Sequence, residues 1–228
     1  MFSVHVPFAM LMAAKRRLSD DDFGALLRAT VIITFRYKVI GSLHTGELER
    51  VYNAIALRLH HSELTTWSQV SDALRPIYLS DEAFRTYFAE AALKTSQSRN
   101  AKIVRYILCQ LEKQVSGQDF DYESANYTIE HILPQSPAQG WEAFNNRDLE
   151  QFAHRIGNTV MLEAGKNRDL GNCSYAEKRP ILQQSAFALT RQLAEENDDW
   201  MPERLTAWQR KLTRIAAGVW RIDRLSEQ

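Results

Sequence analysis

Apolar residues recur every three or four positions through most of the first half of the chain. In the stretch GELERVYNAIALRL these positions hold Leu48, Val51, Tyr52, Ile55 and Leu59. This spacing places the side chains on one face of an α-helix. The stretch NAKIVRYILCQLEKQV has the same period. Both patterns predict amphipathic helices that pack against other elements.

Two of the predicted helices have recognisable N-termini. Ser19 precedes three consecutive aspartates, and Ser80 precedes Asp81 and Glu82. A serine side chain accepts hydrogen bonds from the free amides of a first turn, and acidic residues there interact favourably with the helix dipole. Because the apolar faces need partners, we expect residues 1–118 to form a helical bundle.

The pattern changes after the polar stretch SGQDFDYESAN, which has no helical period and indicates a domain boundary. The runs YTIEHI and NTVMLE are short and β-branched, as is typical of strands. Helical spacing returns near the C-terminus, in the apolar series Leu205, Trp208, Leu212, Ile215 and Val219. We therefore predict a mainly α fold with a small α+β element, divided into domains at 1–118 and 119–228.

Composition narrows the class of protein. The 228 residues are 45% hydrophobic and 25% charged, as in ordinary soluble globular proteins. No apolar run approaches the roughly 18 residues of a membrane helix. The apolar N-terminal residues precede the charged ones, the reverse of a signal peptide. Two cysteines are too few for a disulfide framework or a four-cysteine zinc site, and Cys109 is expected in the core. We expect a cytoplasmic protein.

The charge is balanced overall but unevenly distributed. Residues 1–115 hold 15 Lys+Arg and 11 Asp+Glu, whereas residues 116–228 hold 13 and 17. Surfaces that bind phosphate usually have net positive charge. A nucleic-acid interface in the second half would therefore depend on a local cluster of cations.

Three polar pairs follow one another in the second half, namely Glu130-His131, Gly157-Asn158 and Lys166-Asn167. A hairpin followed by a helix would bring them together. A neutral histidine can take a proton from water. Carboxylate and amide oxygens suit a hard divalent cation. Asn158 could orient the imidazole through its side chain or its backbone carbonyl. These residue types suit phosphodiester hydrolysis.

The blocks TIEHILPQ, RIGNTVML and KNRDLGNCSYAEK together resemble the HNH, or ββα-metal (His-Me finger), nucleases. The resemblance is in particular to the C-terminal nuclease domain of GmrSD-type modification-dependent restriction proteins, and it covers about residues 100–225. It implies a ββα-metal hairpin-helix core. By this resemblance His131 is the general base, Asn158 orients it, and Glu130 and Asn167 bind a divalent metal ion, Mg²⁺ or else Mn²⁺.

The resemblance also implies a biological setting. It indicates a DNA endonuclease that nicks one strand, in a bacterial anti-phage restriction system. The family usually has an N-terminal nucleotide-binding domain with a DGQQR-type motif, and residues 1–126 contain no such motif. A sensor domain or partner subunit outside this sequence is therefore expected. Two alternatives stay open, an RNase or toxin effector and a non-catalytic DNA-binding or assembly module.

Basic residues gather in sequence around the three blocks. Candidate contacts to nucleic acid are His154, Arg155, Lys166, Arg168 and Lys178. Acidic residues are interleaved with them, so a solvated mixed-charge surface is the alternative. Asn172 and Ser174 are expected to be turn and N-cap residues, with a supporting role at the metal site as the alternative. The pair His60-His61 is expected at the surface.

Overall fold

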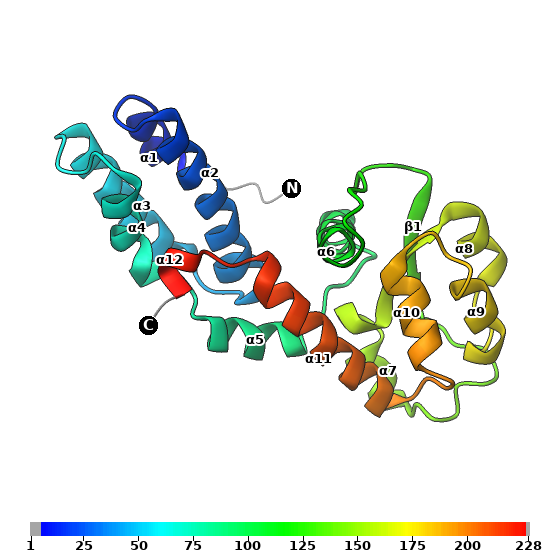
Figure 1. Ribbon diagram of the computed structural model, residues 1–228. Helices are drawn as coiled ribbons and strands as arrows, with labels where there is room; N and C mark the ends of the chain where they lie inside the picture. The colour runs from blue at the N-terminus through cyan, green and yellow to red at the C-terminus, as the bar shows by residue number, and fades with distance from the viewer. Residues whose placement is uncertain (1–5, 227–228) are drawn as a thin grey trace. The chain divides into compact units, whose positions relative to one another are not determined.

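The computed structural model describes residues 6–226, which form helices and one two-stranded antiparallel sheet (Figure 1). The predicted mainly α fold with a small β element is confirmed. The chain divides into two compact units. The hairpin unit comprises residues 89–219, and the helical unit comprises the residues up to 88 together with those from 220 onward. Among the described residues, no helix has the length and apolar character needed to cross a membrane.

The division differs from the boundary expected after residue 118, which lies inside the hairpin unit. The reason is the helix α6 (Ser98–Ser116), whose buried Val104 and Leu108 pack in one cluster with Tyr127 and Met161 of the sheet. The apolar face of α6 was predicted correctly. Its packing partner is the hairpin rather than the preceding helices.

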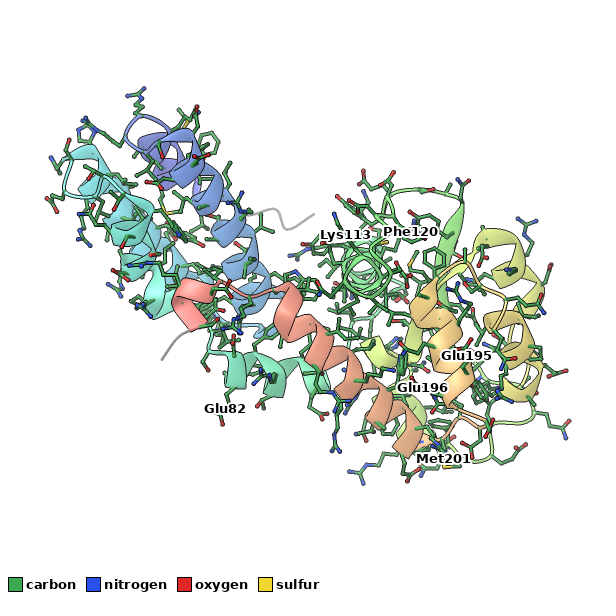
Figure 2. The ribbon with its side chains drawn as sticks, viewed as in Figure 1. Glu82, Lys113, Phe120, Glu195, Glu196 and Met201 are labelled. Carbon is green, nitrogen blue, oxygen red and sulfur yellow. The ribbon has the colours of Figure 1, made fainter. Side chains whose placement is uncertain are left out.

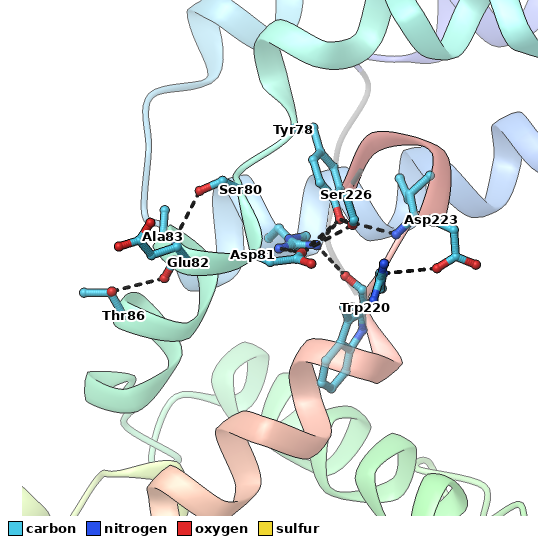
Figure 3. Close-up of polar contacts among 12 residues, drawn as sticks. Tyr78, Ser80, Asp81, Glu82, Ala83, Thr86, Trp220, Asp223 and Ser226 are labelled. Carbon is cyan, nitrogen blue, oxygen red and sulfur yellow. Dashed lines mark hydrogen bonds and ion pairs between the residues drawn. The ribbon is translucent and has the colours of Figure 1, made fainter. Parts of the chain in front are cut away.

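The helical unit is built from short and medium helices. They are α1 (Phe8–Lys15), α2 (Asp20–Thr34), the π-helix η1 (Phe35–Ile40), α3 (Thr45–His60), α4 (Trp67–Leu74), η2 (Arg75–Ile77), most of α5 (Asp81–Glu90) and α12 (Asp223–Ser226). Both predicted N-caps are confirmed. The Ser19 hydroxyl accepts from the Asp22 amide at 3.1 Å, and the Ser80 hydroxyl accepts from the Ala83 amide at 3.2 Å (Figure 3).

The core of the helical unit contains the apolar face predicted for α3. All five of its residues are buried. The C-terminal residues Ile222 and Leu225 belong to the same core. The Trp220 ring stacks on Phe35 with their centroids 4.1 Å apart. Residues 220–225 therefore complete a core that the N-terminal helices begin.

A buried arginine also joins these distant segments. Arg36 is fully buried, donates to the Trp220 carbonyl at 3.0 Å and pairs with Asp81 at 2.6 Å. Its guanidinium also donates to the Tyr78 hydroxyl. That hydroxyl lies 2.7 Å from the Ser226 hydroxyl (Figure 3). This group, the Arg36 cluster, satisfies polar groups that would otherwise be buried without partners.

The hairpin unit begins at the end of α5 and surrounds the sheet with helices. After α6 come β1 (Tyr127–His131), α7 (Asn146–Phe152), η3 (Ile156–Asn158), β2 (Thr159–Glu163), α8 (Ala164–Leu170), α9 (Tyr175–Leu182), α10 (Ala188–Glu196) and α11 (Pro202–Val219). Both predicted strands are confirmed. They pair antiparallel, with Tyr127 opposite Glu163 and His131 opposite Thr159.

Alternation along the strands gives the hairpin two different faces. Tyr127 and Met161 lie on the face that packs against α6, where Phe120 and Phe187 cover them. The Phe120 ring, labelled in Figure 2, lies 4.6 Å from Phe187 between ring centroids. The opposite face carries Glu130. The strand alternation thus sends Glu130 and the neighbouring His131 to different sides of β1.

A buried carboxylate connects α6 to α10. Glu112 is 1% exposed, and its two carboxylate oxygens accept from the amides of Ala188 and Leu189 at 2.8 and 2.9 Å. Both amides belong to the first turn of α10, where no intrahelical acceptor exists. The negative charge also lies at the positive end of the helix dipole. This contact holds α6 and α10 together on one side of the sheet.

Candidate functional site

The end of β1 opens into a cleft of about 250 Å³. The cleft is lined by Glu130, His131, Pro134, Gln135, Ser136, Gly171, Asn172 and Lys178. The Ile132 amide donates to the Asn158 carbonyl at 2.9 Å, after which Pro134 has no amide hydrogen to continue the ladder. β1 therefore ends at Glu130 and His131. Their side chains leave opposite faces of the strand and line the same cleft.

Glu130 is held in a buried ion pair. The Lys178 ammonium donates to Glu130 Oε1 at 2.5 Å and to the His131 carbonyl at 2.8 Å. Lys178 is fully buried and Glu130 is 6% exposed. Burial raises the pKa of Glu130, while the charge and hydrogen bond of Lys178 oppose that rise. The structure thus places Lys178 beneath the cleft as the counter-ion of the carboxylate.

The position of Lys178 follows from the start of α9. Ser174 is the N-cap of this helix, and its amide donates to Glu177 at 2.9 Å in a capping box. The N-cap expectation for Ser174 is confirmed. The capped turn places Lys178 one turn into the helix, directly against the end of β1.

His131 has two polar neighbours. Its Nε2 lies 3.1 Å from the Thr95 hydroxyl and 3.3 Å from the Gln135 side-chain nitrogen. Burial lowers the pKa of His131 to about 4, and the charges of His154 and Lys178 act in the same direction. The imidazole is therefore neutral at physiological pH, which is the state that can accept a proton.

Asn158 is a fully buried hydrogen-bonding centre. Its Oδ1 accepts from the Leu133 amide at 2.8 Å, and its Nδ2 donates to the carbonyls of Leu133 and Ala153 at 2.8 and 3.1 Å. Asn158 was expected to orient the imidazole through its side chain or its backbone carbonyl. The side chain bonds to Leu133 and the carbonyl accepts from the Ile132 amide, so both groups of Asn158 hold the backbone that follows His131.

Asn167 connects α8 to β1. Its Nδ2 donates to the Thr128 hydroxyl at 2.6 Å and to the Ile129 carbonyl at 3.0 Å. Both hydrogen bonds use the amide nitrogen, so the side-chain oxygen points away from these partners. Thr128 and Glu130 share one face of β1 because they are two residues apart. Asn167 therefore belongs to the same face as the Glu130 carboxylate, but it does not line the cleft.

The candidate residues offer few ligands to a hard divalent cation. Glu130 and Asn167 offer oxygen ligands, the type that Mg²⁺ and Mn²⁺ prefer. Within residues 6–226, no group of three or more His, Cys, Asp or Glu side chains could hold a metal ion. Lys178 already neutralises Glu130. The set fits a cation that is weakly held by the protein and takes its other ligands from water and phosphate.

The five candidate contacts to nucleic acid differ in their surroundings. Arg155 is 5% exposed, donates to the Ala89 carbonyl at 3.0 Å and pairs with Glu90. Lys166 pairs with Glu163 at 2.8 Å. Lys178 is buried and His154 is half-buried, with a buried Nδ1 that has no partner. Of the five, Arg168 alone is exposed. The five residues therefore do not form a continuous basic rim.

Thr95 is the site residue that the sequence did not indicate. It precedes His131 by 36 residues and lies outside the three blocks. The segment before it is fixed to residues 154–156 by the bridge of Ala92 with Arg155 and by the Leu93 amide, which donates to the His154 carbonyl at 2.8 Å. Gln135 stood within the block TIEHILPQ, but nothing in that block assigned it a role.

The site is a small polar cleft in a mainly helical domain. It is formed by a hairpin followed by a helix, with an acid-histidine pair at the end of the first strand. The chain belongs to the family described as GmrSD restriction endonucleases, C-terminal domain, whose sequence profile matches residues 78–215. The matched range contains every residue of the cleft. The resemblance to the C-terminal domain of GmrSD-type restriction proteins that was inferred from the sequence is confirmed. No curated protein matches the chain significantly. The chain therefore contains a domain related to restriction endonucleases.

Proposed function

We propose that the hairpin unit is a metal-dependent endonuclease that hydrolyses phosphodiester bonds in DNA and nicks one strand at a time. The observation that supports this proposal best is the neutral His131 in an open cleft beside the Glu130 carboxylate. A single centre of this kind attacks one phosphate. Two visits or two copies would be needed to cut both strands.

In this proposal each residue of the site has a defined task. His131 accepts the proton of the attacking water as general base. Asn158 holds the strand end that presents the imidazole. Glu130 and Asn167 would hold the cation, with Mg²⁺ preferred and Mn²⁺ as the alternative. When bound, the cation supplies positive charge to the phosphate oxygens as they gain negative charge.

The charge of the hairpin unit limits what it can bind alone. Residues 89–219 hold 16 Lys+Arg and 17 Asp+Glu. Binding of DNA by this chain is therefore weak and strongly salt-sensitive, with Arg168 as the exposed cation nearest in sequence to Asn167. Specificity would come from a sensor domain or partner subunit, in a bacterial restriction system against phage.

A plasmid-nicking assay tests the proposal. The full chain should convert supercoiled plasmid to the nicked form with Mg²⁺ or Mn²⁺, and a chelator should abolish the reaction. The variant His131→Ala should lose about two to four orders of magnitude in rate, the usual contribution of a positioned general base. The control His60→Ala, at an exposed position in the helical unit, should keep the parent rate.

Two outcomes would contradict the proposal. Nicking by a folded His131→Ala protein near the parent rate would remove His131 from the mechanism. Faster cleavage of a structured RNA than of plasmid in the same buffer would assign the activity to an RNase. Absence of any cleavage, with DNA still bound, would favour the non-catalytic binding module.

A further inference from the structure

Three polar atoms meet at one edge of the His131 imidazole. His131 Nε2 lies 3.1 Å from the Thr95 hydroxyl oxygen and 3.3 Å from the Gln135 side-chain nitrogen. The Gln135 nitrogen lies 3.4 Å from the Thr95 oxygen. An amide nitrogen is a donor only, whereas each imidazole nitrogen donates or accepts according to the tautomer. A hydrogen bond from the Gln135 nitrogen to Nε2 makes Nε2 the acceptor and places the ring proton on Nδ1.

Hydrogen bonds fix the backbone of the segment that precedes Thr95. The Ala91 carbonyl accepts from the Ile156 amide at 3.2 Å and from the Gln209 side chain at 3.0 Å. The Leu93 amide donates to the His154 carbonyl at 2.8 Å. These hydrogen bonds fix the segment before Thr95 to the backbone just before β2. Thr95 is half-buried, whereas Gln135 is exposed and lines the cleft.

We propose that Thr95 and Gln135 are positioning residues that hold His131 in the tautomer with the proton on Nδ1. Both act on the ring without contacting the reacting phosphate. Histidine without such donors prefers its proton on Nε2, so the two side chains oppose the intrinsic preference of the ring. The consequence for catalysis rests on the proposed function: Nε2 is the nitrogen that receives the proton of the attacking water. Nε2 has a single lone pair, so the attacking water takes the place of both donors on Nε2 when it gives up its proton.

The tautomer can be measured without any nuclease activity. In the ¹⁵N-labelled full chain at pH 7.5 with a chelator, long-range ¹H–¹⁵N correlation distinguishes protonated from unprotonated ring nitrogens. The chain has six histidines, and the His131→Ala spectrum identifies the signals of His131. The parent protein should show a protonated Nδ1 and an unprotonated Nε2. Thr95→Val should shift the population toward protonated Nε2, and Thr95→Ser should retain the parent pattern.

Two further variants make the test specific. Gln135→Leu removes the second donor at an exposed position, where the fold should tolerate it, and should shift the tautomer in the same direction. Thr206→Val removes a hydroxyl that donates only within α11, to the Pro202 carbonyl at 2.8 Å, and should change nothing. A protonated Nε2 in the parent protein, or identical His131 spectra in the parent, Thr95→Val and Gln135→Leu proteins, would overturn the proposal.

The cleavage rate gives an independent measurement. Thr95→Val should lower the rate at saturating DNA roughly two- to tenfold, the effect of one hydrogen bond on a barrier, without changing the DNA concentration for half-maximal rate. Thr95→Ser should restore the rate. If the tautomer is as proposed but the parent chain cleaves nothing, the nuclease function fails and the tautomer assignment stands. If the chain cleaves DNA and Thr95→Val changes neither spectrum nor rate, the positioning role fails.

Discussion

The helical unit and the hairpin unit each bury one cation completely, and the two cations have different surroundings. Arg36 pairs with Asp81 at 2.6 Å, and Lys178 pairs with Glu130 at 2.5 Å. The Arg36 guanidinium lies 4.3 and 4.6 Å from the ring centroids of Tyr78 and Phe84. Lys178 instead lines the open cleft. A buried ion pair can therefore stabilise the packing of one unit and form part of the candidate site in the other.

The surroundings decide whether a ligand can replace one partner. Arg36 is fully buried among aromatic rings and makes directional bonds to Trp220 and Asp81, whose side chain is 21% exposed. The Glu130 carboxylate borders the cleft, where a cation from solution can take over its negative charge. Removing one partner of a buried pair is costly because it leaves an uncompensated charge. The same substitution in the two pairs should therefore give different results.

The largest effect is expected for stability in the helical unit. Arg36→Met should lower the free energy of unfolding of this unit by about 2–4 kcal/mol, because Asp81 and the Trp220 carbonyl lose their partner. Hydrogen exchange of peptides from α2, measured by mass spectrometry, reports this energy for the helical unit alone. The matched control Arg221→Met removes an exposed ion pair with Asp223 and should change the energy by less than about 0.5 kcal/mol.

A double substitution sharpens this prediction. Arg36→Met combined with Asp81→Asn removes both charges and should recover part of the lost stability. If Arg36→Met alone leaves hydrogen exchange in α2 unchanged, the Arg36 cluster does not stabilise the unit and the contrast with Lys178 disappears.

A smaller effect is expected for metal affinity at the cleft. Lys178→Met should strengthen Mn²⁺ binding about tenfold, because a neighbouring positive charge no longer competes for Glu130. Titration calorimetry of the chelator-treated chain measures the dissociation constant, and circular dichroism confirms the fold. The control Lys113→Met, at an exposed lysine labelled in Figure 2, should have the parent affinity. Unchanged or weaker binding in Lys178→Met would show that the cation does not compete with Lys178.

The smallest effect is expected in the pH dependence of the helical unit. Burial raises the pKa of Asp81, but the hydrogen bond and charge of Arg36 outweigh burial, so the pKa lies below its ordinary value of 3.8. Stability from this pair is present above the unfolded pKa and is lost as the pH falls through the lower folded pKa. Lowering the pH from 5 to 3 should therefore reduce the free energy of unfolding of the parent by up to about 1 kcal/mol more than that of Asp81→Asn. Urea unfolding at both pH values measures the difference. Equal acid sensitivity would contradict this assignment.

Local periodicity and capping predicted several of the helices and both strands. The faces of α3 and α6 are buried as predicted, because helical spacing determines which side chains share a face. The packing partner of α6 could not be predicted, since an apolar stripe does not specify what covers it. The division after residue 88 depends on that partner and was missed for the same reason.

Only the part of the site whose residues are adjacent in sequence could be predicted. The block TIEHILPQ predicted the pairing of Glu130 and His131 at a strand end, and the structure places both in one cleft. The ion pair of Glu130 with Lys178 joins residues 48 apart, and the contact of His131 with Thr95 joins residues 36 apart. Such contacts depend on the tertiary fold, and a single sequence gives no signal for them. The roles proposed for these residues remain predictions.

The return of the chain to the helical unit after residue 219 has a consequence for synthesis on the ribosome. The hairpin unit is continuous in sequence, so all of its residues are synthesised before Trp220. The helical unit lacks the aromatic partner of Phe35 and the carbonyl that accepts from Arg36 until Trp220 has been added. Domains fold as their residues become available. The core of the earliest helices therefore cannot be completed until the whole hairpin unit has been synthesised.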